Sequence, residues 1–201
     1  PSGKTVDTFA KSLDDYPSTY NFHESRNYVD YTEDIYVGYR YFETIPGAAE
    51  KVVYPFGYGL SYTTFDVETV SAGVVNSNCT SEANKLYAKV RVTNTGKFSG
   101  KEVVQVYIAK PQGKLGKPAK ELAAFEKTRE LQPGESQLMI LTWEINDMAS
   151  YDDLGKVKKS AYVLEAGSYD IYVGTSVRDV TKADYSYILI HDVITEQLSA
   201  K

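Results

Sequence analysis

The chain has 201 residues, of which 42% are hydrophobic, and a formal net charge of −5. This length allows one large or two small domains, and the apolar fraction is sufficient for a packed core. The acidic balance argues against a nucleic-acid or anionic-membrane partner, and no run approaches the ~18 apolar residues of a membrane span. A single cysteine excludes an internal disulfide framework. No secretory signal is recognisable, but a signal could have been removed, so both a cytoplasmic and a secreted location stay open.

Residues 1–62 show no sustained helical or strand period, and they hold ten of the 18 tyrosines. Residues 14–21 are rich in turn formers. Residues 35–42 are rich in β-formers and predict a strand. A segment of this length with so little regular structure does not build its own core. We therefore expect residues 1–62 to lie against another body.

Residues 63–195 predict an all-β sandwich of the immunoglobulin type, preceded by the loop-rich N-terminal segment. Apolar and polar residues alternate in short runs that are separated by turn residues, as half-buried strands require. The expected strands are residues 65–71, 86–93, 103–108, 121–127, 138–143, 161–164, 169–173 and 185–191. A barrel is the alternative architecture.

The pattern also predicts how individual strands face and turn. The alternation places residues 65, 67, 69 and 71 on one face of the first strand. Residues 138–143 are apolar on both faces, which indicates a central strand. Pro133 and Gly134 have the order that a type II turn requires.

Two long loops are expected within the sandwich. Residues 110–120 carry four lysines, two glycines and two prolines, which predicts a flexible, solvated, basic loop; a lid that reaches a neighbouring site is the alternative. Residues 145–159 carry Asp147, Asp152 and Asp153. These three carboxylates lack the spacing of a calcium-binding loop, so a calcium site is not favoured.

An aromatic run that includes Pro55, Gly57 and Gly59 joins the two parts of the chain. Pro55 restricts φ, and the two glycines permit positive φ or close backbone approach. Aromatic rings at positions 54, 56, 58, 62 and 65 are too many for a solvated turn. We interpret the run as a rigid, buried corner that docks the sandwich onto another body; an ordinary aromatic-lined turn is the alternative.

This run, YPFGYGLSYTTF at 54–65, resembles the start of the fibronectin type III-like domain of glycoside hydrolase family 3, the β-glucosidase and β-xylosidase family. Other segments resemble the family in the same order. They are IYVGYRY (35–41), VTNTG (92–96), GKEVVQVY (100–107), KEL (120–122), LQPGE (131–135) and GSYDIYVG (167–174). Each motif is short, but the ordered set covers most of the chain and is specific.

The resemblance implies a division of the chain. PSGKTVDTF (1–9) resembles the end of an α/β sandwich domain, so residues 1–62 are expected to be that end and an interdomain linker. Residues 63–195 would be the fibronectin type III-like sandwich, and residues 196–201 a linker or the start of a following domain. Residues 193–201 resemble the join in circularly permuted members, in which the barrel follows the sandwich.

No catalytic constellation occurs in the sequence. His23 and His191 have no cysteine or glutamate at ligand spacing, and residues 59–63 lack the last glycine of a nucleophile elbow. Glycoside hydrolysis needs two facing carboxylates. The adjacent pairs at 14–15, 33–34 and 152–153 would point to opposite faces in extended backbone. We assign no catalytic residue, no metal ligand and no cofactor.

The resemblance to glycoside hydrolase family 3 also implies that the catalytic residues lie outside this chain. Family members are retaining enzymes whose Asp nucleophile lies on a (β/α)8 barrel and whose Glu acid/base lies in the α/β sandwich domain; neither motif occurs here. The resemblance implies a non-catalytic segment, inactive alone, of an enzyme that hydrolyses terminal β-D-glucosyl residues. Its partners would be the barrel and the α/β sandwich domain of that enzyme, with the β-glucoside bound through them; a homodimer stays open.

The aromatic runs supply the candidate site residues. The expected interdomain contacts are Tyr36, Tyr39, Arg40, Tyr41, Phe42, Tyr54, Phe56, Tyr58 and Tyr62. Arg40 can pair with a carboxylate or stack on a ring. Direct sugar contact by Glu33 and Arg40 is the alternative. Asn78-Cys79-Thr80 is a glycosylation sequon that matters only in a secreted eukaryotic protein.

Two other functions stay open from the sequence. An independent carbohydrate-binding module would present a row of exposed aromatic residues on one sheet face. An adhesive immunoglobulin-like domain would leave the two aromatic runs, at 35–42 and 54–65, without a role.

Overall fold

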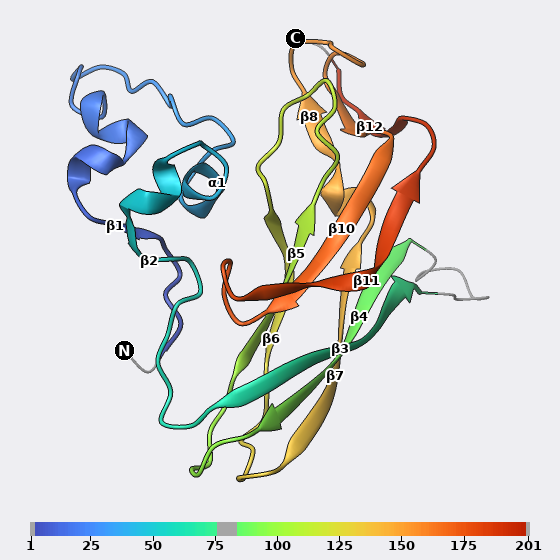
Figure 1. Cartoon of the computed structure of the whole chain (residues 1–201). Helices are drawn as coiled ribbons and strands as arrows, with labels where there is room; N and C mark the ends of the chain where they lie inside the picture. The colour runs from blue at the N-terminus through green and yellow to red at the C-terminus, as the bar shows by residue number, and fades with distance from the viewer. Residues whose placement is uncertain (1–2, 76–83, 200–201) are drawn as a thin grey trace.

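The computed structural model describes residues 3–75 and 84–199, which form a β-sandwich with a loop-rich segment beside it (Figure 1). The first main sheet has the strand order β3-β4-β7 and the second has the order β11-β10-β5-β6. All pairings in both sheets are antiparallel. The predicted all-β sandwich is therefore confirmed. The sequon at 78–80, with Cys79, lies outside the described residues.

The strand bounds follow the predicted runs closely. The strands of the two main sheets are β3 (Phe65–Val74), β4 (Lys85–Asn94), β5 (Val103–Ala109), β6 (Glu121–Lys127), β7 (Ser136–Glu144), β10 (Gly167–Gly174) and β11 (Val180–Leu189). A third, small sheet has the order β12-β9-β8, formed by Val193–Gln197, Ala161–Leu164 and Ser150–Asp152. A 3-10 helix, Asn146–Met148, precedes β8.

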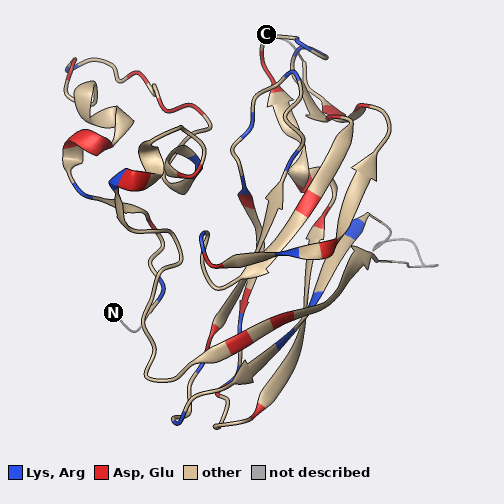
Figure 2. Ribbon diagram, viewed as in Figure 1, with Lys and Arg blue, Asp and Glu red and all other residues tan. Residues whose placement is uncertain are grey.

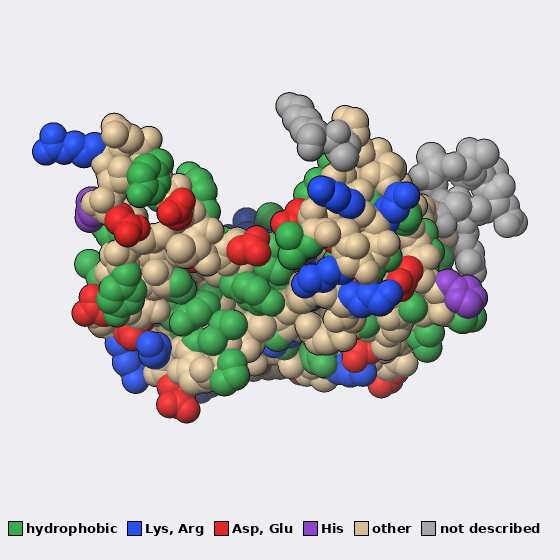
Figure 3. Space-filling model, turned by 90° about the horizontal axis from the view of Figure 1, so that it is seen from above, with side chains coloured by type: hydrophobic (Ala, Val, Ile, Leu, Met, Phe, Trp, Pro, Cys, Tyr) green, Lys and Arg blue, Asp and Glu red, His purple; other side chains and the backbone are tan. Residues whose placement is uncertain are grey.

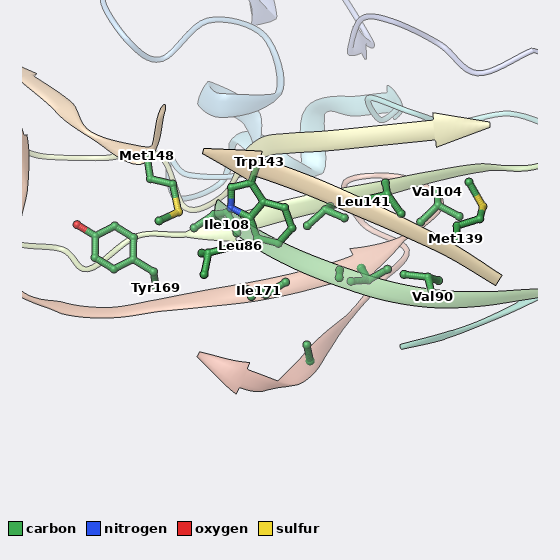
Figure 4. Close-up of a cluster of buried hydrophobic side chains, with 14 of the residues drawn as sticks. Leu86, Val90, Val104, Ile108, Met139, Leu141, Trp143, Met148, Tyr169 and Ile171 are labelled. Atoms are coloured by element: carbon green, nitrogen blue, oxygen red, sulfur yellow. The ribbon is translucent and has the colours of Figure 1, made fainter. Parts of the chain in front are cut away.

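The core lies between the two main sheets, where alternation buries one face of strands such as β4 and β7. Leu86, Val90 and their alternate neighbours on β4 are fully buried. Figure 4 shows Leu86 on β4 close to Trp143 of the neighbouring strand β7 and to Ile171 of β10 in the opposite sheet. Each such buried aliphatic or aromatic side chain contributes about 1.5–3 kcal/mol to folding. The sandwich therefore has a continuous core of its own.

Two predicted details of strand facing are wrong. The β3–β4 register shifts between Thr69 and Ser71, so Ser71 is exposed, and Ala72 and Val74 pack on the core instead. A bulge of this kind inserts one unpaired residue and reverses the phase of alternation. The strand at 138–143 lies in β7, which is an edge of its sheet because it pairs only with β4. Its outer apolar side chains face solvent: Leu138 is 50% and Ile140 59% exposed.

The end of the sandwich also differs from the prediction. The last predicted strand, 185–191, ends at Leu189 in β11, and His191 is exposed. A further strand, β12, then pairs with β9 across the small sheet. The boundary predicted after residue 195 falls inside β12, because Val193–Gln197 is one continuous strand. The predicted turn at Pro133 and Gly134, between β6 and β7, is confirmed: Gly134 has φ +79°, and Glu135 N–H donates to Gln132 C=O at 2.9 Å.

Residues 3–62, called the tail below, lie beside the sheet that contains β5 and β6 (Figure 1). The tail contains 3-10 helices Leu13–Asp15, Pro17–Tyr20 and Ala48–Lys51, a single helical turn α1 (Tyr39–Phe42), and a short β1–β2 pair formed by Phe9–Ala10 and Val52–Tyr54. Backbone bonds of 2.7 and 2.9 Å link Thr5 to Tyr58 and Gly57. These hydrogen bonds join the beginning of the tail to its end.

Charged residues are distributed over both parts of the molecule. Figure 2 shows acidic and basic residues interspersed along the tail and the sandwich strands, without a continuous basic stripe in this view. Within residues 3–75 and 84–199, the structure contains no helix long and apolar enough to cross a membrane.

Candidate functional site

The helical turn α1 brings two aromatic rings of the tail into packed positions. Gly38 precedes it with φ +58° and ψ −129°, a conformation that only glycine adopts readily. Phe42 is 1% exposed, with its ring 5.5 Å from that of Tyr16. The strand predicted for residues 35–42 is wrong, because a helical turn places Tyr39 and Phe42 on one side, where both find partners.

Tyr39 is the central contact between the tail and the sandwich. Its ring centroid lies 4.7 Å from that of Phe56 and 6.1 Å from that of Tyr107 on β5. Its hydroxyl accepts a hydrogen bond of 2.9 Å from the backbone N–H of Leu122 on β6. The β5–β6 register shifts beside Leu122, between Val106 and Tyr107. The tail thus satisfies a donor at an irregular point of the sheet.

The aromatic corner also lies close against β5. Gly57 has φ +80°, and a Cβ added there would lie 2.7 Å from the Gln105 amide. Phe56 C=O accepts a 3.1 Å hydrogen bond from Val177 N–H, in the turn between β10 and β11. The Tyr107 hydroxyl donates to Gln105, and burial raises the pKa of Tyr107. Tail residues therefore cover the face of β5 that points away from the core.

An ion pair fastens the tail at a second point. Arg178 Nε lies 2.8 Å from a carboxylate oxygen of Glu43, and Arg178 Nη2 donates to Ala49 C=O at 3.0 Å. Nearby, Ala119 N–H donates to the Thr44 hydroxyl at 2.8 Å. The tail is therefore held to the sandwich by stacking, by an ion pair and by backbone hydrogen bonds.

The lysine-rich loop at 110–120 is packed, so the prediction of a flexible, solvated loop is wrong. Lys117 is 2% exposed, and its ammonium pairs with the buried carboxylate of Glu165. Burial alone would raise the pKa of Glu165, but hydrogen bonds from Lys117 and from the N–H groups of Lys114 and Leu115 outweigh it and hold that pKa below its usual range. The loop is anchored because its charges have partners inside the fold.

A cavity of about 530 Å³, called the junction pocket below, opens between the tail and the sandwich. Figure 3 shows the surface hollowed between these two parts. Asp34, Tyr36 and Arg40 line it from the tail, and Lys110 and Glu121 line it from the sandwich. Lys110 Nζ lies 2.8 Å from Glu121, and burial, opposed by Glu121, lowers the pKa of Lys110.

Arg40 lies at the wall of this pocket without a side-chain partner. The guanidinium makes no hydrogen bond or ion pair with any residue that the structure describes. Arg40 also contributes to lowering the pKa of Lys110, so the two cations lie near each other. The arrangement can receive a carboxylate. Glu33, the other predicted sugar contact, is not among the described residues that line the pocket, although its neighbour Asp34 is.

Of the remaining predicted contact residues, some pack against other rings of the tail and some are exposed. Tyr41 packs edge-on against Phe42 at 5.1 Å, and Tyr58 stacks on Tyr54 at 5.0 Å. Tyr54 is 43% exposed and Tyr62 87% exposed. The aromatic run at 54–65, which we predicted to be a buried corner, is therefore only partly buried within this chain. Contact of these residues with further domains stays a prediction.

The acidic loop after β7 is ordered around one carboxylate. Asp152 is 1% exposed and accepts hydrogen bonds of 2.7–3.0 Å from the backbone N–H groups of residues 155–158. Burial alone would raise the pKa of Asp152, but these four bonds outweigh it and lower that pKa. Both oxygens serve the loop itself. The described residues contain no group of three metal-ligating side chains.

Sequence reasoning missed several residues that position the tail. Gln105 and Tyr107 were placed only within the expected strand 103–108, although a polar face with a large ring is a signal for a covering segment. Arg178 and Glu43 are 135 residues apart. No local pattern connects such a pair, so only the folded chain identifies it.

Comparisons with known proteins agree with the architecture. The model of the fibronectin type III-like domain family matches residues 102–177. Beta-glucosidase A of Butyrivibrio fibrisolvens is 60% identical over 100% of this chain, which covers 25% of that protein. A beta-glucosidase of Ruminococcus albus is 44% identical over 98% of this chain, which covers 20% of it.

Solved structures give the same result. A beta-glucosidase from Paenibacillus barengoltzii matches all of this chain with a TM-score of 0.91 and 49% identity, over 22% of its own length. The GH3 beta-glucosidase of Bifidobacterium adolescentis also matches all of this chain, with a TM-score of 0.78 and 32% identity, over 27% of its length.

Over its whole length the chain is therefore similar to one segment of beta-glucosidases, which include a GH3 enzyme. The resemblance drawn from the ordered motifs is therefore confirmed, as is the fibronectin type III-like domain. The chain spans only about a fifth to a quarter of the relatives it matches. Those relatives are longer beta-glucosidases in which the matching region is one part of a larger chain.

Proposed function

We propose that this chain is a non-catalytic accessory segment of a β-glucosidase that hydrolyses terminal β-D-glucosyl residues, and that it supports the packing of the catalytic domains. The observation that carries the proposal is the exposed apolar surface of the tail. Between residues 13 and 37 the exposed large hydrophobic residues are Leu13, Tyr20, Phe22, Tyr28, Val29, Tyr31, Ile35 and Val37. They range from 40% to 87% exposure. Apolar side chains concentrated in this way mark an interaction site.

One side of the tail packs against the sandwich, and another side is exposed to solvent. Tyr39, Phe56 and Gly57 face β5 and β6. The exposed residues between 13 and 37 have no such cover within this chain. The matched relatives are about four to five times longer than the region they share with it. We infer that the α/β sandwich domain and the barrel of the same enzyme cover the free side.

Arg40 gives this interface a polar anchor. Its guanidinium lines the junction pocket and has no partner among the described residues. A guanidinium pairs best with a carboxylate through two parallel hydrogen bonds. We expect an acidic side chain of the catalytic domains to enter the pocket beside Arg40. Lys110, already paired with Glu121, would add to the positive potential there.

The direct test is a mixing assay with p-nitrophenyl β-D-glucoside as substrate. The chain alone, the catalytic portion of its parent enzyme alone, and the two together are compared. Hydrolysis that appears or rises strongly only on mixing is the expected result. Hydrolysis by the chain alone, or full activity of the catalytic portion without it, would contradict the proposal.

Matched surface variants locate the contact. Tyr31→Ser changes an 87% exposed ring of the tail, and Phe125→Ser changes a 70% exposed ring on β6 of the sandwich. Burying one aromatic ring is worth about 2–3 kcal/mol, so Tyr31→Ser is expected to weaken association of the two portions at least ~tenfold. Phe125→Ser is expected to leave it unchanged. Equal effects of the two variants would argue against docking through the tail.

A further inference from the structure

The small sheet carries a pair of exposed tyrosines that the accessory role does not use. Tyr151 on β8 and Tyr162 on β9 lie directly opposite each other in the register. Their ring centroids are 5.2 Å apart, and they are 45% and 38% exposed. Neither hydroxyl has a hydrogen-bond partner among the described residues. The pair therefore presents apolar ring surface together with two available hydroxyl groups.

Each ring of the pair borders a hollow. Tyr162 lines a cavity of about 380 Å³ together with Asn146, Asp147, Thr195 and Glu196. Tyr151 lines the junction pocket on the other side, and Ala149 lines both hollows. The two tyrosine rings thus lie between the junction pocket and the 380 Å³ cavity. A ligand longer than one sugar-sized ring could contact both tyrosines.

The chemistry of the smaller hollow narrows the class of ligand. Its polar lining consists of one side-chain amide, two hydroxyls and two carboxylates, with no Lys, Arg or His among the described residues that line it. Carboxylates and amide oxygens accept hydrogen bonds from hydroxyl groups, while two carboxylates without a cation repel an anion. Aromatic faces bind apolar surface that carries polar edges. A neutral, polyhydroxylated ring satisfies all three conditions.

The site is also held by rigid backbone. The Tyr151–Tyr162 pair lies on a β8–β9 ladder that β12 extends on its other side. The loop that joins β8 to β9 is ordered by the four hydrogen bonds to Asp152. Little conformational freedom would be lost on binding, which favours affinity at a shallow surface.

We infer that this surface, formed by Tyr151, Tyr162 and the hollow with Asn146, Asp147 and Glu196, binds a neutral β-linked gluco-oligosaccharide. One sugar ring stacks on Tyr162 and directs hydroxyls to the carboxylates and the amide. The next ring passes over Tyr151. The choice of β-linked glucose rests on the proposed function, because it supposes that the ligand is related to the substrate of the parent enzyme. The binding site itself is independent of the docking surface on the tail.

The test is isothermal titration of the 201-residue chain with cellotetraose, with maltotetraose as the α-linked comparison. Saturable binding of cellotetraose is expected, with at least tenfold loss of affinity in Tyr162→Ala and a smaller loss in Glu196→Gln. Phe125→Ala, an exposed ring on β6, is the matched control and should bind as the wild type does. Absence of binding, equal affinity in Tyr162→Ala, or tighter binding of maltotetraose would each overturn the inference.

The mixing assay separates this inference from the proposed function. Tyr162→Ala is expected to complement the catalytic portion as well as the wild-type chain does. Loss of complementation in Tyr162→Ala would make the surface a contact of the catalytic domains and would overturn the sugar site. If the wild-type chain does not complement but still binds cellotetraose through Tyr162, the accessory role fails and the sugar site stands.

Discussion

The hydroxyl of Thr63 donates a buried hydrogen bond of 2.7 Å to the side-chain oxygen of Asn94, at the point where the tail passes into the sandwich. The same oxygen accepts from Gly96 N–H at 3.1 Å. The side-chain nitrogen of Asn94 donates to the carbonyls of Phe98 and Leu131, at 2.8 Å each. Asn94 is 0% exposed. One fully satisfied amide therefore joins the first residue of the sandwich to two of its turns.

Replacing Asn94 is expected to be among the most destabilising changes in the sandwich. Asn94→Ala removes the acceptor of the buried Thr63 hydroxyl and the donor to the Phe98 and Leu131 carbonyls, of which Leu131 C=O keeps a hydrogen bond from Gly100 N–H. Each group left unsatisfied costs about 1–3 kcal/mol. We expect a loss of at least ~3 kcal/mol in the free energy of unfolding. Asn94→Asp should be as harmful, because a carboxylate oxygen would face two carbonyl oxygens. Urea unfolding followed by tryptophan fluorescence measures the loss.

Two threonine variants serve as controls for that prediction. Thr63→Val removes only the hydroxyl donor and should cost about 1–2 kcal/mol. The adjacent Thr64 shares a 2.9 Å contact with Thr95 at an exposed position, so Thr64→Val should cost less than about 0.5 kcal/mol. Equal costs for the two valine variants would contradict the role given to Asn94.

The Tyr39 hydroxyl should hold the tail to the sandwich. Tyr39→Phe keeps the ring against Phe56 but leaves Leu122 N–H without its acceptor, at a cost of about 1–2 kcal/mol. The expected result is faster cleavage of residues 3–62 in limited proteolysis, with the sandwich left intact. Tyr41→Phe is the matched control, because its hydroxyl has no partner among the described residues. Equal cleavage rates in the two variants would show that the hydroxyl does not hold the tail.

The buried Lys117–Glu165 pair should determine the order of the loop at 110–120. Lys117→Met leaves the Glu165 carboxylate buried without its cation, which costs about 3–5 kcal/mol. Hydrogen exchange at the N–H groups of Lys114 and Leu115 should become faster, because both donate to Glu165. Arg129→Met breaks an exposed pair with Glu135 and should cost less than about 1 kcal/mol. Unchanged exchange in Lys117→Met would refute the anchoring role.

The Asp152 carboxylate should make stability depend on pH in the acidic range. Its pKa is lowered in the fold, so its stabilisation is complete above the unfolded value of about 3.9 and is lost as the pH falls toward the lower folded pKa. Asp152→Asn should therefore be less stable than wild type at pH 7, with a shallower loss of stability below about pH 4. Thermal unfolding between pH 2 and 7 measures both. Asp153→Asn, at the exposed neighbour, should follow the wild-type curve.

Much of the sandwich was predictable because its signals are local. Period-two alternation identified β4 and β10, since one face of each strand packs on the core and the other does not. The turn at Gly134 was predictable because only glycine tolerates the positive φ that the turn requires. The bulge at Thr69 and Ser71 was not, because a single inserted residue leaves no mark in an alternating pattern.

The candidate site was predictable only in part. The aromatic runs and the family resemblance predicted Tyr39, Phe42 and Phe56 as interdomain contacts, and contact with further domains stays a prediction. Within this chain, the partners of Tyr39 on the sandwich, Tyr107 and Leu122, come from strands that are distant in the sequence. The tyrosine pair of the small sheet depends on the register of β8 against β9, which no local signal specifies.

The amino-acid sequence by itself determined the all-β class, most strand positions and the family, because alternation, turn residues and ordered motifs are properties of the chain read locally. Tertiary structure alone decided that residues 39–42 form a helical turn and that Lys117 of the lysine-rich loop is buried. In both places local propensity is weak, and the free energy comes from distant partners: Tyr107 and Leu122 for Tyr39, and Glu165 for Lys117. Where a residue's partner lies far along the chain, packing and charge pairing outweigh the preferences that the sequence displays.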